Sequence, residues 1–394
     1  MENPKIRFKG FTKDWEQRKF GSLLEETRNK TIFEDEDTLL SCAIDGMYLN
    51  SELFSHFRGS SNIGYLKVKK NDLILSAQNL HLGNCNVNLR FEHGIISPAY
   101  KVYELVGCNP LFMQAWVKKD STKDFFLKSS TEGASVCRKN IVWEELYKQE
   151  LPVPSIEEQT KVGEYFYSLD HLFTLHQRKC EQTKNLKKYM LQKMFPQNGA
   201  KVPEIRFNGF THDWEQRKLI DYLEVSSEKN RDNRFTKDDV LSVSGEYGIV
   251  NQIEFQGRSF AGASVSNYGV VENGDVVYTK SPLKSNPYGI IKTNKGIPGI
   301  VSTLYAVYKP KEITDSKFVQ IYFELDSRMN SYMHPLVNKG AKNDMKVSAE
   351  NALKGMVSFP KKDEQEMISL YFSNLDHLIT LHQRQHKLHL NALL

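Results

Sequence analysis

A stretch rich in side-chain amides and without acidic residues occupies Leu73–Phe91. Amides both donate and accept hydrogen bonds, so Asn or Gln can pair with adenine, while Arg can bind guanine or phosphate. Asn is also an ordinary turn former, and the residues leave both interpretations open. The candidate contacts in the first half, with an arginine upstream and a loop downstream, are Arg58, Gln78, Asn79, His81, Asn84, Asn86, Asn88, Arg90, Arg138 and Lys139.

A basic stretch occupies Val276–Lys311 in the second half and also lacks Asp and Glu. Small polar and aromatic residues alternate with its lysines, and a second basic cluster follows it. Lysines that neutralise phosphates give strong, sequence-independent attraction, so these loops predict a nucleic-acid surface. The candidate contacts here are Lys280, Ser281, Lys284, Ser285, Asn286, Tyr288, Lys292, Lys339, Lys342 and Asn343.

Composition is compatible with nucleic-acid binding and argues against disulfide-rich, zinc-binding and membrane-spanning proteins. The chain has 394 residues, a net charge of +5 and 26% charged residues, which permits a polyanionic partner without requiring one. Its five cysteines are odd in number and form no CxxC pair, so we expect neither disulfides nor a zinc site, and a cytoplasmic location. No apolar run is long enough to span a membrane.

The motifs of catalysis are incomplete. Asn286-Pro287-Tyr288 lacks one proline of the adenine methyltransferase motif, and Phe260-Ala261-Gly262-Ala263 lacks the second glycine of a methyl-donor loop. No GxxxxGK[ST], HExxH or GxSxG sequence is present. Histidines repeat at spacings that do not share a helix face, so no metal site is expected. The sequence therefore predicts no catalytic residue and no cofactor bound by this chain.

Two pairs of near-identical segments show that the chain is duplicated. The first pair, here called the tags, is Pro4–Lys19 and Pro203–Lys218. The second pair is Leu169–Arg178 and Leu375–Arg384, which differ at a single position. Each half therefore runs from tag to variable region to helix. A repeat this long fits a duplicated domain rather than a solenoid.

Apolar residues around the second pair recur at alternating spacings of four and three, which predicts a helix with one apolar row, here called the seam. Two equal seams most simply pack on each other; the alternative is two helices, each lying on its own domain. Leu172, Leu175, Leu378 and Leu381 are expected to widen the seam. Its core residues are Val162, Phe166, Leu169, Phe173, Ile368, Phe372, Leu375 and Ile379.

The variable regions share a skeleton of short strands, for example Asn71–Ile74 beside Gly274–Val277. Ser155 is expected to cap the first long helix, with Glu158 as its capping-box partner. We predict an α+β fold with a pseudo-two-fold internal repeat: two similar mixed α/β domains and two long helices. The expected boundaries are 1–154 and 197–360 for the domains with their tags, and 155–196 and 361–394 for the helices.

The tags RFKGFTKDWEQRK and RFNGFTHDWEQRK, each followed by a divergent region and a P-x-x-x-EQ helix at Pro154–Gln159 and Pro360–Gln365, resemble type I restriction–modification specificity subunits. The resemblance covers nearly the whole chain. It implies that each variable region is a target recognition domain reading one half of a bipartite, asymmetric site in double-stranded DNA. It also implies an antiparallel coiled coil of the helices as spacer.

The same resemblance implies partners and an absence of catalysis. Two modification (methyltransferase) subunits would dock on the chain, and motor–nuclease restriction subunits would join for cleavage. S-adenosylmethionine, ATP and Mg²⁺ would be bound by those partners. One departure is that the second helix has no match for Tyr189–Pro196. Two alternatives remain open: a self-contained DNA methyltransferase or endonuclease, and a coiled-coil scaffold that binds no DNA.

Overall fold

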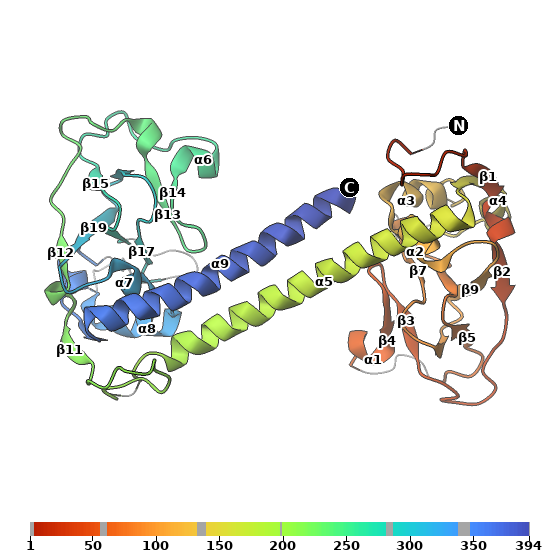
Figure 1. Ribbon diagram of the computed structural model, residues 1–394, viewed down its shortest axis with the longest axis horizontal. Helices are drawn as coiled ribbons and strands as arrows, with labels where there is room; N and C mark the ends of the chain where they lie inside the picture. Colours follow the sequence, from red (N-terminus) through yellow and green to blue (C-terminus); the bar gives the residue numbers. More distant parts are fainter. Residues whose placement is uncertain are drawn as a thin grey trace. The chain divides into compact units, whose positions relative to one another are not determined.

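The computed structural model describes residues 4–55, 61–131, 139–197, 199–280, 287–337 and 347–393, with side chains up to residue 385 (Figure 1). It contains two compact units, Met1–His176 with Gln385–Leu394, and Gln177–Arg384. Each unit is a mixed α/β domain, as the sequence predicts. None of the helices described is long and apolar enough to cross a membrane.

The first unit is built on an antiparallel four-stranded sheet in the order β2-β9-β6-β7. Its strands are β2 (Leu24–Thr27), β6 (Leu73–Ser76), β7 (Cys85–Val87) and β9 (Tyr100–Leu105). Three two-stranded ladders surround it: β1 (Glu16–Lys19) with β10 (Glu150–Val153), β3 (Leu40–Cys42) with β4 (Met47–Leu49), and β5 (Leu66–Lys69) with β8 (His93–Ile96). The helices are η1 (Phe20–Leu23), α1 (Asn50–Leu53), η2 (Leu80–Leu82), α2 (Pro110–Lys118), α3 (Asp120–Leu127), α4 (Trp143–Lys148) and the long α5 (Ile156–Lys193).

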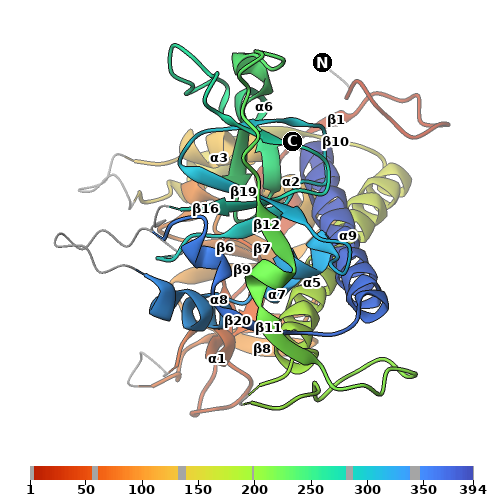
Figure 2. The same cartoon turned by 90° about the vertical axis from the view of Figure 1, so that its left-hand side faces the viewer.

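The second unit repeats this plan, with the order β12-β19-β16-β17; β19 and β16 are seen side by side in Figure 2. Its strands are β12 (Leu223–Val225), β16 (Val276–Thr279), β17 (Ile291–Thr293) and β19 (Tyr305–Pro310). The ladders are β11 (Glu215–Lys218) with β20 (Met356–Phe359), β13 (Leu241–Ser244) with β14 (Gly248–Asn251), and β15 (Gly269–Val271) with β18 (Gly299–Val301). The helices are η3 (Leu219–Asp221), η4 (Lys237–Asp239), α6 (Gln252–Gln256), α7 (Ser316–Tyr322), α8 (Asp326–Met333), η5 (His334–Leu336), η6 (Asn351–Leu353) and α9 (Lys362–Leu393).

The turn before β6 and β16 shows how closely the two units agree. Asn71 and Gly274 both have positive φ, 74° and 90°, a conformation that Asn and Gly adopt most easily. Asp72 and Asp275 follow, and each accepts a backbone N–H across the turn, at 2.7 and 2.9 Å. The shared skeleton predicted from these residues is therefore one turn built twice.

Each unit has an aromatic core between its sheet and helices. In the first, Phe20 packs against Trp116, Phe125 and Phe126 with centroids 5.5–6.2 Å apart. In the second, Phe195, which follows α5 closely, packs among aromatic rings: Trp214, Phe318, Tyr322, Phe359 and Phe372. Leu191 of α5 belongs to the same cluster, so the end of α5 is part of the second hydrophobic core.

The seam residues are the less exposed positions of both helices, as a heptad pattern predicts. Ile368, Phe372 and Leu375 are buried, and the others are half-buried. The expectation that four further leucines widen the seam is wrong, because they lie on exposed helix faces. Their exposed fractions are 36–43%: Leu172, Leu175, Leu378 and Leu381.

Within the second unit, the end of α5 and the start of α9 pack antiparallel. The thiol of Cys180 lies 4.0 Å from the carbonyl oxygen of Ile379, and Lys187 binds Asp376 at 2.6 Å. Further along α5 the partner residues on α9 have lower numbers, which defines the direction. The two helices therefore contact each other in this unit rather than only their own domains.

Candidate nucleic-acid surface and tag–helix junction

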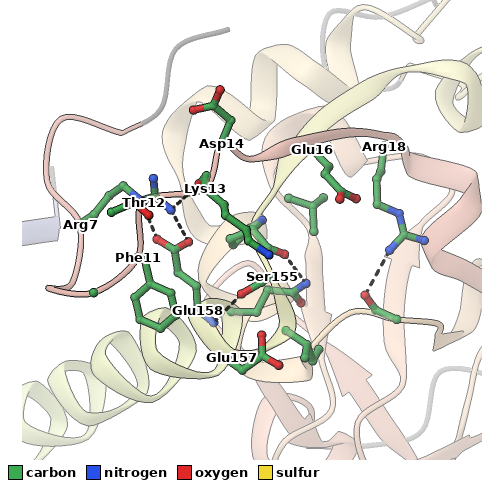
Figure 3. A pocket seen from close by; sticks show the side chains of 16 residues that line it. Arg7, Phe11, Thr12, Lys13, Asp14, Glu16, Arg18, Ser155, Glu157 and Glu158 are labelled. Carbon is green, nitrogen blue, oxygen red and sulfur yellow. Dashed lines mark hydrogen bonds and ion pairs between the residues drawn. The ribbon is translucent and has the colours of Figure 1, made fainter.

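Each tag is fixed to the first turn of a long helix by a bidentate ion pair. Arg7 donates to the two carboxylate oxygens of Glu158 at 2.8 and 2.6 Å, and also to the carbonyl of Lys13 at 2.8 Å (Figure 3). In the second tag, Arg206 donates to Glu364 through Nε and Nη2, each at 2.7 Å, and Nη2 also donates to the carbonyl of His212 in its own tag. The Ser155 hydroxyl accepts the backbone N–H of Glu158 at 3.4 Å, which confirms the predicted helix cap. The predicted capping box is wrong for the Glu158 carboxylate, which binds the tag instead.

The glutamine after each of these glutamates holds the recognition region. Gln159 accepts the backbone N–H of Asn109 at 2.7 Å and donates to the carbonyl of Pro154. Gln365 accepts the N–H of Asp315 at 3.0 Å and donates to the carbonyl of its own proline. The P-x-x-x-EQ sequence therefore joins tag, helix and recognition region at one point, here called the tag–helix junction.

Strand pairing repeats the same connection in both units. The tag strand β1 pairs with β10 so that Glu16 lies opposite Val153, and β11 pairs with β20 so that Glu215 lies opposite Phe359. These strand partners precede the P-x-x-x-EQ helices directly. The near-identity of the tags is thus explained by one structural junction that occurs twice.

Replacing Glu364 with Gln should lower the free energy of unfolding of the second unit by about 1.5–3 kcal/mol, the scale of a hydrogen bond to a charged group. The side chain is 3% exposed, so water cannot replace the lost interaction. Glu158→Gln should act in the same direction on the first unit. The exposed Glu366 provides the control, because Glu366→Gln removes a charge two residues away, on another face of the helix. Equal effects of Glu364→Gln and this control would contradict the junction.

A pocket of about 480 Å³ lies beside the first junction, between the tag and the start of α5 (Figure 3). Its walls carry both signs of charge, including Lys13, Arg18, Glu16 and Glu157. Such a mixture does not select an anion or a cation. The residues described contain no group of three His, Cys, Asp or Glu side chains placed to hold a metal ion.

The loop between β6 and β7 presents part of the predicted amide cluster. Gln78 is exposed, and Asn79 and Asn84 are half-buried. Arg90 is exposed, forms an ion pair with Glu52 at 2.7 Å and lies 4.8 Å from the ring of Phe91. These side chains stay candidates for contact with a nucleic acid.

The prediction that Asn86 and Asn88 contact DNA is contradicted, because both residues are fully buried. Their role is structural. Asn86 donates to the carbonyl of Ala43 at 2.6 Å and accepts from Gln114. Asn88 donates to the carbonyls of Lys69 and Phe91, at 3.0 and 2.8 Å, and Asn294 bridges two carbonyls in the same way in the second unit. Their amides satisfy backbone groups that would otherwise be buried without partners.

The prediction that His81 contacts DNA is also contradicted, because the residue is only 9% exposed. Neither ring nitrogen finds a hydrogen-bond partner among the residues described. Burial lowers the pKa of His81, and the positive charge of Lys139 lowers it further. The imidazole is therefore an uncharged interior group near the half-buried Lys139, which stays a candidate.

In the second unit, Lys280 and Tyr288 are half-buried at the two described ends of the basic loop. Burial lowers the pKa of Lys280, and the nearby Lys229 adds to this effect. The prediction that Lys292 contacts DNA is contradicted, because Lys292 is only 8% exposed and lies in β17. The remaining candidates lie outside the described residues: Arg58, Arg138, Ser281, Lys284, Ser285, Asn286, Lys339, Lys342 and Asn343.

An exposed aromatic group near α6 was missed in the sequence. Tyr247 and Phe255 lie with ring centroids 5.5 Å apart, and the guanidinium of Arg258 lies 4.5 Å from the ring of Phe260. All three rings are exposed, by 46–62%. The available signal was an arginine among aromatic residues, a combination that can stack on bases.

No protein-family model matches the chain, and no curated protein matches it. The type-I restriction-modification system S subunit from M. genitalium has a similar structure, with a TM-score of 0.59 and 13% identity over 100% of this chain and 97% of that chain. Two further structures have TM-scores of 0.44. The HsdS subunit from Thermoanaerobacter tengcongensis is 16% identical over 96% of this chain and 95% of its own. A structure described for complex assembly and conformational transition of the type I R-M system is 14% identical over 96% and 94%.

The match to the M. genitalium subunit extends over essentially the whole of both chains. At this identity it establishes a shared fold. The resemblance to type I specificity subunits that the tags indicate is thereby confirmed at the level of the fold.

Proposed function

We propose that this chain is the DNA-recognition subunit of a type I restriction–modification complex. The observation that carries the proposal is the duplicated unit, with one tag–helix junction in each copy, in a fold shared with a solved S subunit. Catalysis would belong to the partners, which would bind S-adenosylmethionine, ATP and Mg²⁺. The chain would act in the cytoplasm, where its cysteines stay reduced.

In this proposal each unit reads one half of a bipartite DNA site. The two central sheets have the same strand order, but the loops that follow β6 and β16 differ. The first presents amides such as Gln78 and Asn79, and the second presents Lys280 and Tyr288. Different side chains on sheets of the same topology would contact different bases, so the two half-sites should differ in sequence.

The helices would set the distance between the half-sites as an antiparallel coiled coil. Helix α5 is continuous over 38 residues, or about 57 Å at 1.5 Å per residue. The packing of its end against α9 within the second unit supports this arrangement. A rigid pair of helices would leave a fixed number of base pairs unread between the half-sites.

Two modification subunits would dock on the helices. The exposed leucines occur in equivalent pairs, Leu172 and Leu175 on α5, and Leu378 and Leu381 on α9. Exposed leucines at heptad spacing are suited to packing against helices of another protein. Two equivalent pairs would accept two equal partners, and the motor–nuclease subunits would join that complex.

The proposal is tested by gel shift of the full chain with mixed duplex DNA, alone and with a modification subunit. We expect sequence-specific binding by the complex, with affinity that falls steeply between low and moderate salt as counterions are released. Methyl transfer by the chain alone would favour the self-contained enzyme. Absence of DNA binding in either form would favour the scaffold.

Replacing Lys280 and Lys284 with Ala should weaken recognition of the second half-site by about tenfold per lost phosphate contact and reduce the salt slope. The first half-site should still be read, because it belongs to a separate unit. Gln78→Ala with Asn79→Ala is the reciprocal control. Methylation mapping of both variants measures the effect, and equal loss at both halves would contradict modular recognition.

A further inference from the structure

The end of α5 is held by groups from the recognition region and the tag of the second unit. A helix leaves its last four carbonyl groups without partners inside the helix. In α5 each of these carbonyls accepts a hydrogen bond, and the acceptor–donor pairs are Met190–Met194, Leu191–Arg328, Gln192–Gln197 and Lys193–Ile205. Arg328 belongs to α8 and Ile205 to the tag, so tertiary contacts complete this helix end.

Arg328 joins the helix end to the recognition region. Its Nη2 donates to the carbonyl of Leu191 and its Nη1 to the carbonyl of Tyr322, both at 2.8 Å. The guanidinium carbon lies 4.3 Å from the ring centroid of Phe195 and 5.0 Å from that of Tyr322. Figure 1 shows α8 beside the end of α5. These four residues are here called the helix-end contact.

Dipoles, and not an acidic side chain, stabilise the charge of Arg328. The residue is half-buried and forms no ion pair within the part of the chain that the structure describes. Burial lowers the pKa of Arg328 to about 10, so the guanidinium stays charged at neutral pH. The carbonyl groups at a helix C-terminus carry partial negative charge, and aromatic faces attract cations. The site of Arg328 therefore suits a helix end.

The first unit has a different residue at the equivalent position. Helices α3 and α8 both begin with Asp-Ser, and the next residue is Thr122 in α3 and Arg328 in α8. Thr122 donates to the carbonyl of Trp116 at 2.6 Å, and Trp116 is equivalent to Tyr322. The bond to the preceding helix is thus common to both units. The bond to Leu191 is added only in the second, so the shared fold does not require it.

The helix-end contact gives α5 a fixed attachment at both ends. At the start of α5, Glu158 binds the tag and Gln159 binds the recognition region of the first unit. At its end, Leu191 and Phe195 contact the recognition region of the second unit. The helix is continuous over the 38 residues of its length. A helix can set a distance between two regions only if both of its ends are fixed to them.

We propose that Arg328 is a positioning residue for DNA recognition, which fixes the second recognition region to the end of α5 and so restricts the gap between the half-sites to one length. The inference rests on the proposed function, in which the helices set that gap. Without the helix-end contact, the second unit would keep its sheets and its tag–helix junction, because neither includes Arg328. Its orientation on α5 would vary, and neighbouring gaps would become acceptable.

Arg328→Thr installs the residue of the first unit, which should keep the bond to Tyr322 and lose the bond to Leu191. Methylation mapping with the full chain and its modification subunit, on DNA with variable gaps, measures the preference for the native gap over gaps one base pair shorter or longer. We expect this preference to fall by about tenfold, the effect of one lost hydrogen bond to a charged group, with both half-site sequences unchanged. Phe195→Leu removes the ring beside Arg328 and should act in the same direction.

Val301→Ala is the control for lost stability. Val301 of β18 is buried in a core cluster that does not include α5. This variant should unfold at a lower temperature but keep the native gap preference. Hydrogen exchange of the free chain gives a readout without DNA: in Arg328→Thr the amides of Tyr189–Phe195 should lose about tenfold of their protection, and the start of α5 should be unchanged.

The outcomes separate this inference from the proposed function. An undiminished gap preference in Arg328→Thr and Phe195→Leu, or an equal loss of preference in Val301→Ala, would overturn the inference and leave the proposed function standing. Unchanged exchange at the end of α5 in Arg328→Thr would also overturn it. A native complex that methylates no bipartite site would contradict the proposed function, and the inference with it.

Discussion

Inserting one heptad after Arg178 and one after Arg384 should lengthen the unread gap between the half-sites without changing either half-site sequence. Seven residues add about 10 Å to a helix, or roughly three base pairs at ~3.4 Å each. A heptad keeps the seam in register. Three base pairs also rotate the second groove by about 100°, so weaker binding is expected as well. Methylation mapping on DNA with variable gaps measures the change.

An insertion of four residues at the same places is the matched control. It shifts the seam to another helix face, so it should disrupt the helix pair and lower the unfolding midpoint instead of changing the gap. If the heptad variant recognises the original gap and does not recognise a longer gap, the helices do not set the spacing.

Replacing Leu172 and Leu175 with Asp should remove one modification subunit from the complex, and Leu378→Asp with Leu381→Asp should remove the other. These leucines are already 36–43% exposed, so the free chain should unfold at nearly its normal temperature. A charge placed in the centre of a helix interface is desolvated and unpaired. We expect this to weaken docking by about a hundredfold or more.

The chain offers an internal control for this docking prediction. Ser168 and Asn374 are exposed, equivalent positions on the same two helices. Ser168→Asp and Asn374→Asp introduce the same charge outside the leucine pairs and should leave both partners bound. The number of modification subunits per chain is measured by native mass spectrometry. Retention of two partners by the fourfold Leu→Asp variant would show that they bind elsewhere.

The duplication and the seam could be predicted because both are recognised from residues that lie close together in the sequence. Near-identical tags indicate equal structures, and a heptad row indicates a packed helix face whatever lies opposite. The seam residues from Val162 to Ile379 are accordingly the less exposed ones of their helices. The turn at Asn71 and Gly274 was predictable for the same reason, since its backbone conformation depends on a few adjacent residues.

The burial of individual polar residues could not be predicted in this way. Asn86 and Lys292 occupy equivalent strand positions opposite Ile74 and Val277, yet nothing nearby in sequence shows that this strand face is interior. The partner of Asn86 that makes burial tolerable, Gln114, comes from a helix later in the chain. Amide and lysine content alone therefore predicted DNA contacts for residues that are buried, such as Asn86 and Lys292.

The tag–helix junction escaped prediction for a related reason. Arg7 and Glu158 are 151 positions apart, and a local capping motif offered a simpler role for the glutamate. The exposed leucines were misassigned because a heptad pattern does not distinguish the face against one helix from a face left for a further partner. Tertiary contacts decide both points.

We propose that two different recognition units act together on one bipartite site. Sequencing-based mapping of DNA methylated by the purified complex of the full chain with its modification subunit tests this most directly. We expect methylation at two different half-sites separated by one fixed gap, with none by the modification subunit alone. A single uninterrupted site, or the same methylation pattern without this chain, would contradict it.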